Sequence, residues 1–166
     1  MGCDIHIVLE RKDRNGQWFG WKQLSYMETE ALTFMYLNYE TTHERPRYVG
    51  YTIDQRNYEF FNALCGVRGE GSEFGYEPRG LPEDASPMVR ECLDDNVDLH
   101  SHSWLTIKEL VPCLAAHWGG DKKKEEYIFE RMANEDGNLY LATQLVDGGI
   151  NNENADDWRL VFAFDN

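Results

Sequence analysis

The sequence has no long apolar run, no signal peptide and no complete lipidation signal. A membrane-spanning helix needs about 20 consecutive apolar residues, and no stretch of the chain is nearly that long. We therefore expect no transmembrane segment and no membrane partner. The N-terminus lacks the basic start and apolar core of a secretory signal. Met1-Gly2-Cys3 resembles the start of a myristoylation signal, but His6 stands where that signal needs Ser or Thr. We therefore expect a soluble cytoplasmic protein.

Cysteine pairs are also missing. The four cysteines, at positions 3, 65, 92 and 113, are far apart, and no Cys-x-x-Cys motif exists. A zinc ribbon and a thioredoxin-like redox motif are therefore excluded. We expect no disulfide in a reducing cytoplasm, and we expect each cysteine to act as a small buried hydrophobic side chain.

Basic residues are scarce in this chain. There are 16 Lys and Arg against 30 Asp and Glu, which gives a net charge of −14. Such a chain repels a phosphate backbone, so general nucleic-acid binding is disfavoured. The charge fits an ordinary solvated surface, and it also fits attraction to the basic surface of a partner protein. In the second case the protein would mimic nucleic acid.

The residues that are present predict an α+β fold. The 166 residues are 42% hydrophobic and 13% aromatic, which is enough for a single globular domain over residues 1–166. Alternating apolar residues predict strands, and apolar residues at helical spacing predict several short helices. We expect a mixed or mainly antiparallel sheet whose first and last strands are interior and close together. Strands are predicted at 3–10, 17–24, 48–53 and 158–164, and helices at 55–65, 86–94, from 107 onward and at 121–134.

Short local signals bound several of these elements. Asn15-Gly16 is typical of the turn of a β-hairpin, and Ser86-Pro87 is typical of a helix that begins with a cap and a proline. Thr106 and Glu109 form a capping-box pattern, in which each side chain binds the backbone amide of the other. A helix should therefore begin directly after the extended segment 100–106.

Two stretches place acidic and imidazole groups at alternate positions. Asp4 and His6 lie in the first expected strand, while Asp98, His100 and His102 precede the capping box. In an extended backbone alternate side chains share a face, so each stretch offers a group of possible ligands. We predict that these five residues form a divalent metal site, for zinc or manganese.

The same histidines allow two other interpretations. His100 and His102 can act without a metal as a catalytic acid–base pair. Serine, histidine and aspartate are also common before helices because they bind loose backbone amides, so both histidines can be ordinary structural residues. The metal interpretation requires that the two stretches, which are distant in the chain, lie side by side.

The segment 66–82 is a glycine-rich loop with two arginines. It is not a dinucleotide fingerprint, because Phe74 occupies the third glycine position, and it lacks the Gly-Lys-Ser/Thr of a Walker loop. Arg68 and Arg79 are candidates for binding a phosphate group, and Trp104 is a candidate for stacking on a base. The alternative is an ordinary irregular connection.

Six motifs are spread along the chain. They are Met1–His6, Arg56–Tyr58, Gly66–Arg68, Arg79–Pro82, His100–Thr106 and Phe162–Asn166. In these motifs the chain resembles a family of uncharacterised proteins encoded by bacteriophages and prophages, and the resemblance spans nearly its whole length. It implies a phage origin and action in the cytoplasm of the host cell, but it implies no particular activity.

These observations support three hypotheses about function. In the first, the protein is a metal-dependent hydrolase of phosphoester or nucleotide substrates, because a bound metal lowers the pKa of its water to about 7. In the second, it is a non-catalytic anti-defence protein that binds a basic host protein or sequesters a signalling nucleotide. In the third, it is a structural or accessory phage protein, although no repeat or coiled coil supports this. The sequence leaves open whether the protein is an enzyme.

Overall fold

The chain adopts an α+β fold in the computed structural model. The structure describes residues 2–24, 33–38, 47–52, 58–71, 76–110, 137–142 and 154–166. The helix expected at 121–134 lies outside them, as does the beginning of the helix expected at 55–65. Within these ranges no helix is long and apolar enough to cross a membrane. That the whole chain forms one domain stays a prediction.

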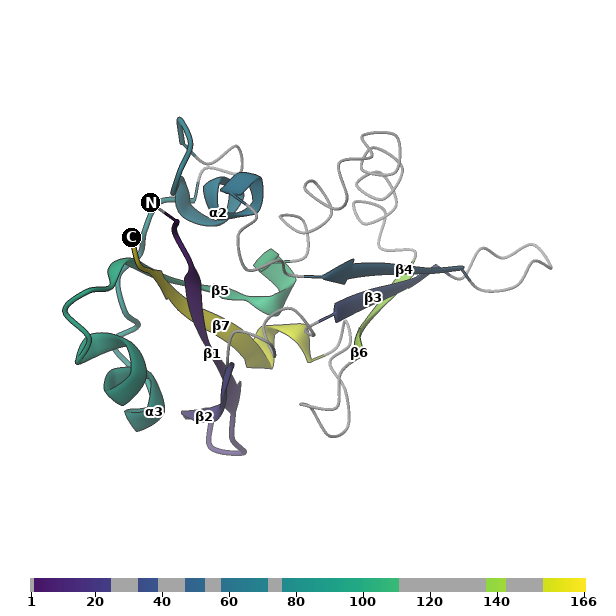
Figure 1. Cartoon of the computed structure of the whole chain (residues 1–166). Helices are drawn as coiled ribbons and strands as arrows, with labels where there is room; N and C mark the ends of the chain where they lie inside the picture. The colour runs from purple at the N-terminus through teal and green to yellow at the C-terminus, as the bar shows by residue number, and fades with distance from the viewer. Residues whose placement is uncertain are drawn as a thin grey trace.

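Four strands form the main sheet, in the order β2-β1-β7-β5 (Figure 1). They are β1 (Ile5–Lys12), β2 (Trp18–Leu24), β5 (His100–Thr106) and β7 (Trp158–Phe164). Every neighbouring pair is antiparallel. The prediction that the first and last strands are interior and close together is therefore confirmed. Because β1 and β7 run in opposite directions, the start of β1 lies beside the end of β7.

The predicted Asn15-Gly16 turn joins β1 to β2. Asp13 organises it, because its Oδ1 accepts hydrogen bonds from the amides of Asn15 (2.8 Å) and Gln17 (2.9 Å). Gly16 has a φ of +77°, which a residue without a Cβ adopts at little steric cost. The turn thereby fixes the register of the hairpin.

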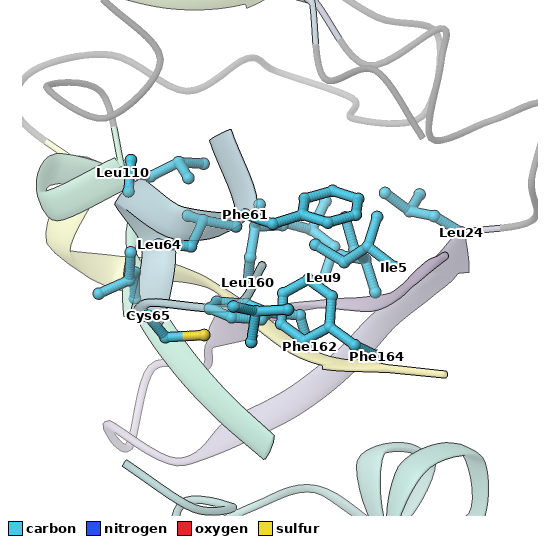
Figure 2. Packing of buried hydrophobic residues seen from close by; sticks show 14 of the residues in the cluster. Ile5, Leu9, Leu24, Phe61, Leu64, Cys65, Leu110, Leu160, Phe162 and Phe164 are labelled. Carbon is cyan, nitrogen blue, oxygen red and sulfur yellow. The ribbon is translucent and has the colours of Figure 1, made fainter. Parts of the chain in front are cut away.

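Helix α2 (Tyr58–Cys65) covers one face of the main sheet. Strands β1 and β7 direct alternate apolar residues to this face, for example Ile5 opposite Phe164. Phe61 of α2 packs against them, with its ring centroid 5.0 Å from that of Phe164 (Figure 2). Burying one side chain of this size contributes about 1.5–3 kcal/mol. The main hydrophobic core therefore lies between α2 and the sheet.

Helix α3 (Pro87–Val89) continues as the π-helix η1 (Arg90–Asp94), and together they cover the opposite face. Ser86 caps α3, because its Oγ accepts a hydrogen bond from the Val89 amide (3.4 Å), and Pro87 takes the first helical position as predicted. Both helices pack on the residues of β1 and β7 that alternate with those of the main core. The sheet is therefore covered on both faces.

A buried ion pair joins β1 to β7 on the face covered by α3. Glu10 and Arg159 are register partners, and their side chains are 0% and 2% exposed. Glu10 also accepts a hydrogen bond from the Ser86 amide (2.8 Å), while Arg159 binds the Asp84 carboxylate (2.9 Å). The Arg159 guanidinium lies 4.1 Å from the centroid of the Trp18 ring. The ion pair thus ties the segment before α3 to the sheet.

Three further strands form a second antiparallel sheet, in the order β4-β3-β6 (Figure 1). They are β3 (Thr33–Asn38), β4 (Arg47–Thr52) and β6 (Gly137–Ala142). The strand predicted at 48–53 is thereby confirmed. All strand pairs of the described chain are antiparallel, in agreement with the predicted mainly antiparallel arrangement.

Candidate functional site

The start of β1, the end of β7 and the start of β5 meet at one end of the main sheet (Figure 1). The ladder between β1 and β7 extends beyond Phe164. The amide of Asp165 donates to the Asp4 carbonyl (3.1 Å), and the amide of Asp4 donates to Asp165 Oδ1 (3.0 Å). The two sequence stretches that carry the candidate histidines therefore lie on either side of the last strand.

His6 and Asp165 form a hydrogen-bonded pair at this end of the sheet. The distance from His6 Nε2 to Asp165 Oδ2 is 2.9 Å, and the two side chains are 39% and 35% exposed. Because the ionised carboxylate only accepts, the imidazole carries a proton on Nε2, so the neutral ring has its lone pair on Nδ1. A carboxylate that fixes the tautomer and orientation of a histidine prepares it for general-base catalysis.

The neighbours of Asp165 keep its carboxyl group ionised. Partial burial on its own would raise the pKa of this group. The hydrogen bonds from His6 and from the Asp4 amide, together with the charges of His6 and His100, outweigh burial and lower the pKa of Asp165 below its ordinary value.

A β-bulge at Ser101 separates the two histidines of β5. The segment His100–Ser103 is opposite Phe162–Phe164, so three steps along β5 correspond to two along β7. Ser101 has a φ of +52°, in the left-handed region. The extra residue reverses the alternation of faces from this point onward. The expectation that His100 and His102 share one face is therefore wrong.

His102 faces α3 and η1. Its Nε2 donates to the carbonyl of Leu93 in η1 (2.9 Å). Its own carbonyl oxygen accepts from the amide of Gly80 (2.9 Å). These bonds give His102 a structural role, because they join β5 to η1 and to the loop that precedes α3.

His100 lies on the face covered by α2, with its ring centroid 6.3 Å from that of Phe164. Its Nδ1 is 3.0 Å from Ser101 Oγ. Its Nε2 is buried and has no hydrogen-bond partner within the described part of the chain. A buried polar atom without a partner costs about 1–3 kcal/mol, and such an atom points to a bound group or a chemical role.

A hollow of about 410 Å³ adjoins His100, between the end of α2, the loop at 77–78 and the start of β5. Two of its lining residues, Arg68 and Ser101, have positive φ angles of +63° and +52°, and no other residue except glycine does so in the described ranges. Strained backbone of this kind is concentrated at functional sites. The polar lining is completed by Glu77 and Asn166.

Cys65 also borders the hollow, but its thiol is unreactive. Burial raises the pKa of this thiol to about 12, and the charge of Glu77 adds to the effect, while a backbone hydrogen bond from Val67 opposes it. The thiolate is the nucleophilic form of cysteine, and almost none is present at neutral pH. The chemistry of the site therefore falls to the imidazole, carboxylate and guanidinium groups.

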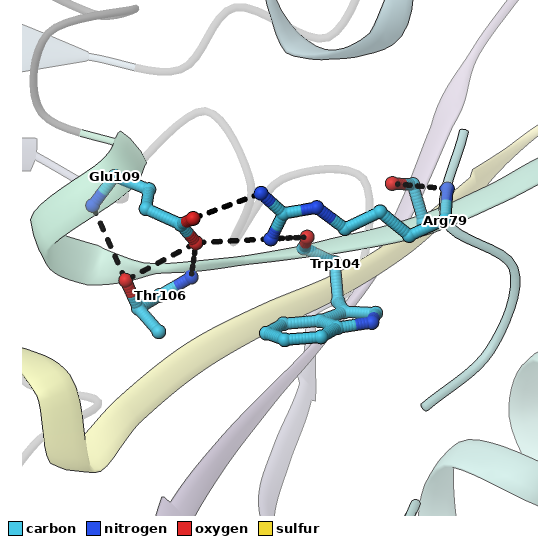
Figure 3. Close-up of polar contacts among 5 residues, drawn as sticks. Arg79, Trp104, Thr106 and Glu109 are labelled. Atoms are coloured by element: carbon cyan, nitrogen blue, oxygen red, sulfur yellow. Dashed lines mark hydrogen bonds and ion pairs between the residues drawn. The ribbon is translucent and has the colours of Figure 1, made fainter. Parts of the chain in front are cut away.

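Arg79, one of the two predicted phosphate ligands, is held by Glu109 (Figure 3). Its terminal nitrogens are 3.0 and 2.8 Å from the two carboxylate oxygens, and Nη1 also donates to the Trp104 carbonyl (3.1 Å). Glu109 completes the predicted capping box, because it accepts from the Thr106 amide (3.0 Å) and its own amide donates to Thr106 Oγ1 (3.2 Å). The capping box is confirmed, and Arg79 is bound to it.

Trp104, the predicted stacking residue, lies beside two guanidinium groups. The centroid of its ring is 4.8 Å from the guanidinium carbon of Arg79 and 5.4 Å from that of Arg159. Such cation–π contacts are attractive and account for the position of the indole. Stacking of a base on Trp104 stays a prediction.

The five predicted metal ligands are spread over more than one place. Within the described residues, no group of three or more His, Cys, Asp or Glu side chains could hold a metal ion. His102 is bound to Leu93, and Asp98 is exposed in the turn before β5. The five residues therefore do not form one ligand set here, and a zinc or manganese site stays a prediction.

Asp165 and Asn166 are the site residues that the sequence reasoning missed. A signal for them existed, because the last strand was predicted to end at Phe164 and to lie close to the first strand. In an antiparallel pair, polar residues directly after the last strand must lie beside the residues that open the first strand. The pairing of β1 with β7 thus gives His6 its carboxylate partner.

The end of the main sheet combines a His–Asp pair, a second histidine with an unpaired nitrogen, and a hollow lined by an arginine and a glutamate. Such an assembly can transfer protons and can bind a charged molecule. Comparisons with protein-family models, with curated proteins and with solved structures found no match for this chain.

Proposed function

We propose that the protein is a phosphoester hydrolase in which His6, held by Asp165, acts as the general base without a metal. The observation that carries the proposal is the 2.9 Å hydrogen bond between His6 and Asp165. The substrate is a small phosphorylated molecule such as a nucleotide. The phage origin implied by the family resemblance is part of this proposal.

In the proposed reaction His6 is the general base. His6 Nδ1 accepts a proton from water while the water oxygen forms a bond to phosphorus. The ester P–O bond breaks, and the leaving oxygen takes a proton from water. Asp165 holds His6 in the required tautomer and stabilises the imidazolium that forms. Proton exchange with water then restores His6.

Turnover of nucleoside monophosphates and cyclic nucleotides, followed by chromatography of the products, tests this proposal. General acid–base catalysis contributes about 10²–10⁴-fold, so His6→Gln should lower kcat by at least about 100-fold. Asp165→Asn should also lower kcat, because the amide can favour the wrong tautomer of His6. His102→Gln is the matched control and should keep the activity, since His102 is bound to Leu93. An equal loss in His6→Gln and His102→Gln would contradict the proposal.

Metal removal separates the two catalytic hypotheses. Dialysis against a chelator should leave turnover unchanged if His6 acts without a metal. Loss of turnover on chelation, with recovery in zinc or manganese, would support the metal-dependent hydrolase instead. In that case the metal ligands would have to come together in an arrangement that the described residues do not show.

The second candidate function is binding without catalysis, either to a basic host protein or to a signalling nucleotide that is sequestered. Its specific support is the acidic surface of η1 and the turn after it, where Glu91, Asp94, Asp95 and Asp98 are exposed. The whole chain has a net charge of −14, and this acidic surface would attract a basic partner. Nucleotide binding without conversion would favour this candidate over hydrolysis.

A further inference from the structure

The hollow beside His100 has a polar lining that the His6–Asp165 pair does not explain. Arg68 brings a positive charge to it and Glu77 a negative charge. We propose that this hollow binds a nucleoside monophosphate, with its phosphate group on Arg68 and His100 and its sugar hydroxyl groups on Glu77. The proposal goes beyond the proposed function, because neither His6 nor Asp165 lines this hollow.

Arg68 lines the hollow and has no ion pair with a carboxylate among the described residues, so its charge is available to an anion there. The guanidinium groups of Arg79 and Arg159 are both held by carboxylates in ion pairs. Within the described residues Arg68 contacts neutral groups: Nη2 donates to Asn166 Oδ1 (3.0 Å), and the guanidinium carbon is 5.8 Å from the centroid of the Tyr58 ring. A guanidinium without a carboxylate partner is well suited to bind two phosphate oxygens.

The loop that carries Arg68 is shaped by close packing on α2. Gly66 and Arg68 both have positive φ angles, of +78° and +63°. A Cβ at Gly69 would lie 2.1 Å from Asn62 Oδ1, so only glycine allows this approach of the loop to the helix. A loop packed in this way lowers the entropy that Arg68 loses when it binds a ligand.

His100 and Ser101 contribute hydrogen-bonding groups at the start of β5. Nε2 of His100 is buried and unpaired in the described structure, and when protonated it can donate to a phosphate oxygen. That bond would remove the cost of leaving the atom unpaired. The bulge at Ser101 places His100 on the same face as the end of α2, and therefore on the same side as Arg68.

Glu77 determines how many phosphate groups the ligand can carry and which of its groups lies beside the carboxylate. Its carboxylate has no ion pair with any described residue, and its charge is felt by the Cys65 thiol. A carboxylate repels a second phosphate group, whereas it accepts hydrogen bonds from sugar hydroxyl groups. The volume of about 410 Å³ is within the range of small-molecule sites. The lining therefore favours a nucleoside monophosphate over a diphosphate.

Calorimetric titration of AMP into the His6→Gln variant tests the binding site separately from catalysis. This variant lacks the proposed base, so AMP is not consumed. In the same background, Arg68→Gln should weaken AMP binding about ten- to a hundredfold, and Arg68→Lys should weaken it less. Arg14→Gln removes the same charge from the exposed β1–β2 turn and should keep the affinity within about twofold. Glu77→Gln should reduce the preference for AMP over ADP.

Two results would overturn the inference. One is an equal AMP affinity in Arg68→Gln and Arg14→Gln, with unchanged melting temperatures in both. The other is no AMP binding up to about 1 mM in the His6→Gln protein. Neither result bears on hydrolysis, which is judged by the turnover of wild type against His6→Gln. Loss of turnover with intact AMP binding supports both proposals.

Discussion

Two charge pairs join β1 to β7, and they differ most in their burial. Glu10 and Arg159 lie on the face covered by α3, with side chains 0% and 2% exposed. His6 and Asp165 lie at the end of the sheet and are 39% and 35% exposed. Both carboxylate oxygens of Glu10 accept hydrogen bonds, one from Ser86 and one from Arg159. In the exposed pair, His6 Nδ1 has no partner among the described residues.

This difference separates a structural pair from one that can react. Removing ions from water costs several kcal/mol each, so a buried pair is stable only when all its groups are bound, and it cannot exchange partners. An exposed pair contributes only about 0–1 kcal/mol and opens easily. His6 can therefore gain and lose a proton without disturbing the fold, whereas Glu10 and Arg159 cannot.

Breaking the buried pair should have the largest effect on stability. Arg159→Met should lower the free energy of unfolding by about 3–5 kcal/mol, because it leaves Glu10 charged and buried without its cation. Urea unfolding followed by tryptophan fluorescence measures this loss. The double variant Glu10→Leu with Arg159→Met should be more stable than Arg159→Met alone, since both charges are removed. A loss below about 1 kcal/mol in the single variant would show that the buried pair stabilises the fold no more than an exposed pair does.

The ion pair of Arg79 and Glu109 is intermediate, with side chains 28% and 33% exposed. Glu109→Ala should lower the free energy of unfolding by about 1–2 kcal/mol, because it removes both the ion pair and one half of the capping box. Arg79→Gln should cost less, since the bonds between Thr106 and Glu109 remain. Thermal unfolding of the two variants measures the difference. Equal losses would mean that the capping box adds nothing to stability.

Breaking the exposed pair should have the smallest effect on stability. Asp165→Asn should lower the free energy of unfolding by about 0.2–1 kcal/mol at pH 7. The pKa of Asp165 is lowered in the folded protein, so its stabilisation is present above the pKa of the unfolded chain and is lost as the pH falls through the folded pKa. Urea unfolding at pH 7 and pH 3 should therefore show a smaller difference between variant and wild type in acid. If the difference between variant and wild type were larger at pH 3 than at pH 7, the lowered pKa of Asp165 would be contradicted.

Much of the fold could be predicted because its signals are local. The segment from Trp158 to Phe164, which is apolar except for Arg159, indicated the bounds of the last strand. Ser86 and Pro87 marked the start of α3, and Thr106 with Glu109 marked the helix after β5. Each signal depends on residues a few positions apart, whose backbone geometry their own side chains determine.

The site could be predicted only in part. Alternation suggested that His100 and His102 share a face. No residue type in His100–Ser103 predicts the bulge, because the residue with the left-handed backbone, Ser101, is not a glycine. The bond of Arg79 to Glu109 depends on two segments that are 30 positions apart. Asp165 becomes a partner of His6 only through the pairing of β1 with β7. Partners of this kind are set by tertiary structure.

The bulge at Ser101 means that one strand presents imidazole groups to two different environments, although the two histidines are only two positions apart. Deletion of Ser101 would leave His100 opposite Phe164 and directly next to His102 in the chain, so the two rings would still project from opposite faces of β5. Regular pleating at unchanged length would instead turn His100 toward η1 alongside His102, and the hollow next to Arg68 would lose an imidazole from its lining. The left-handed backbone of a single serine therefore keeps one histidine beside the hollow and the other bound to Leu93.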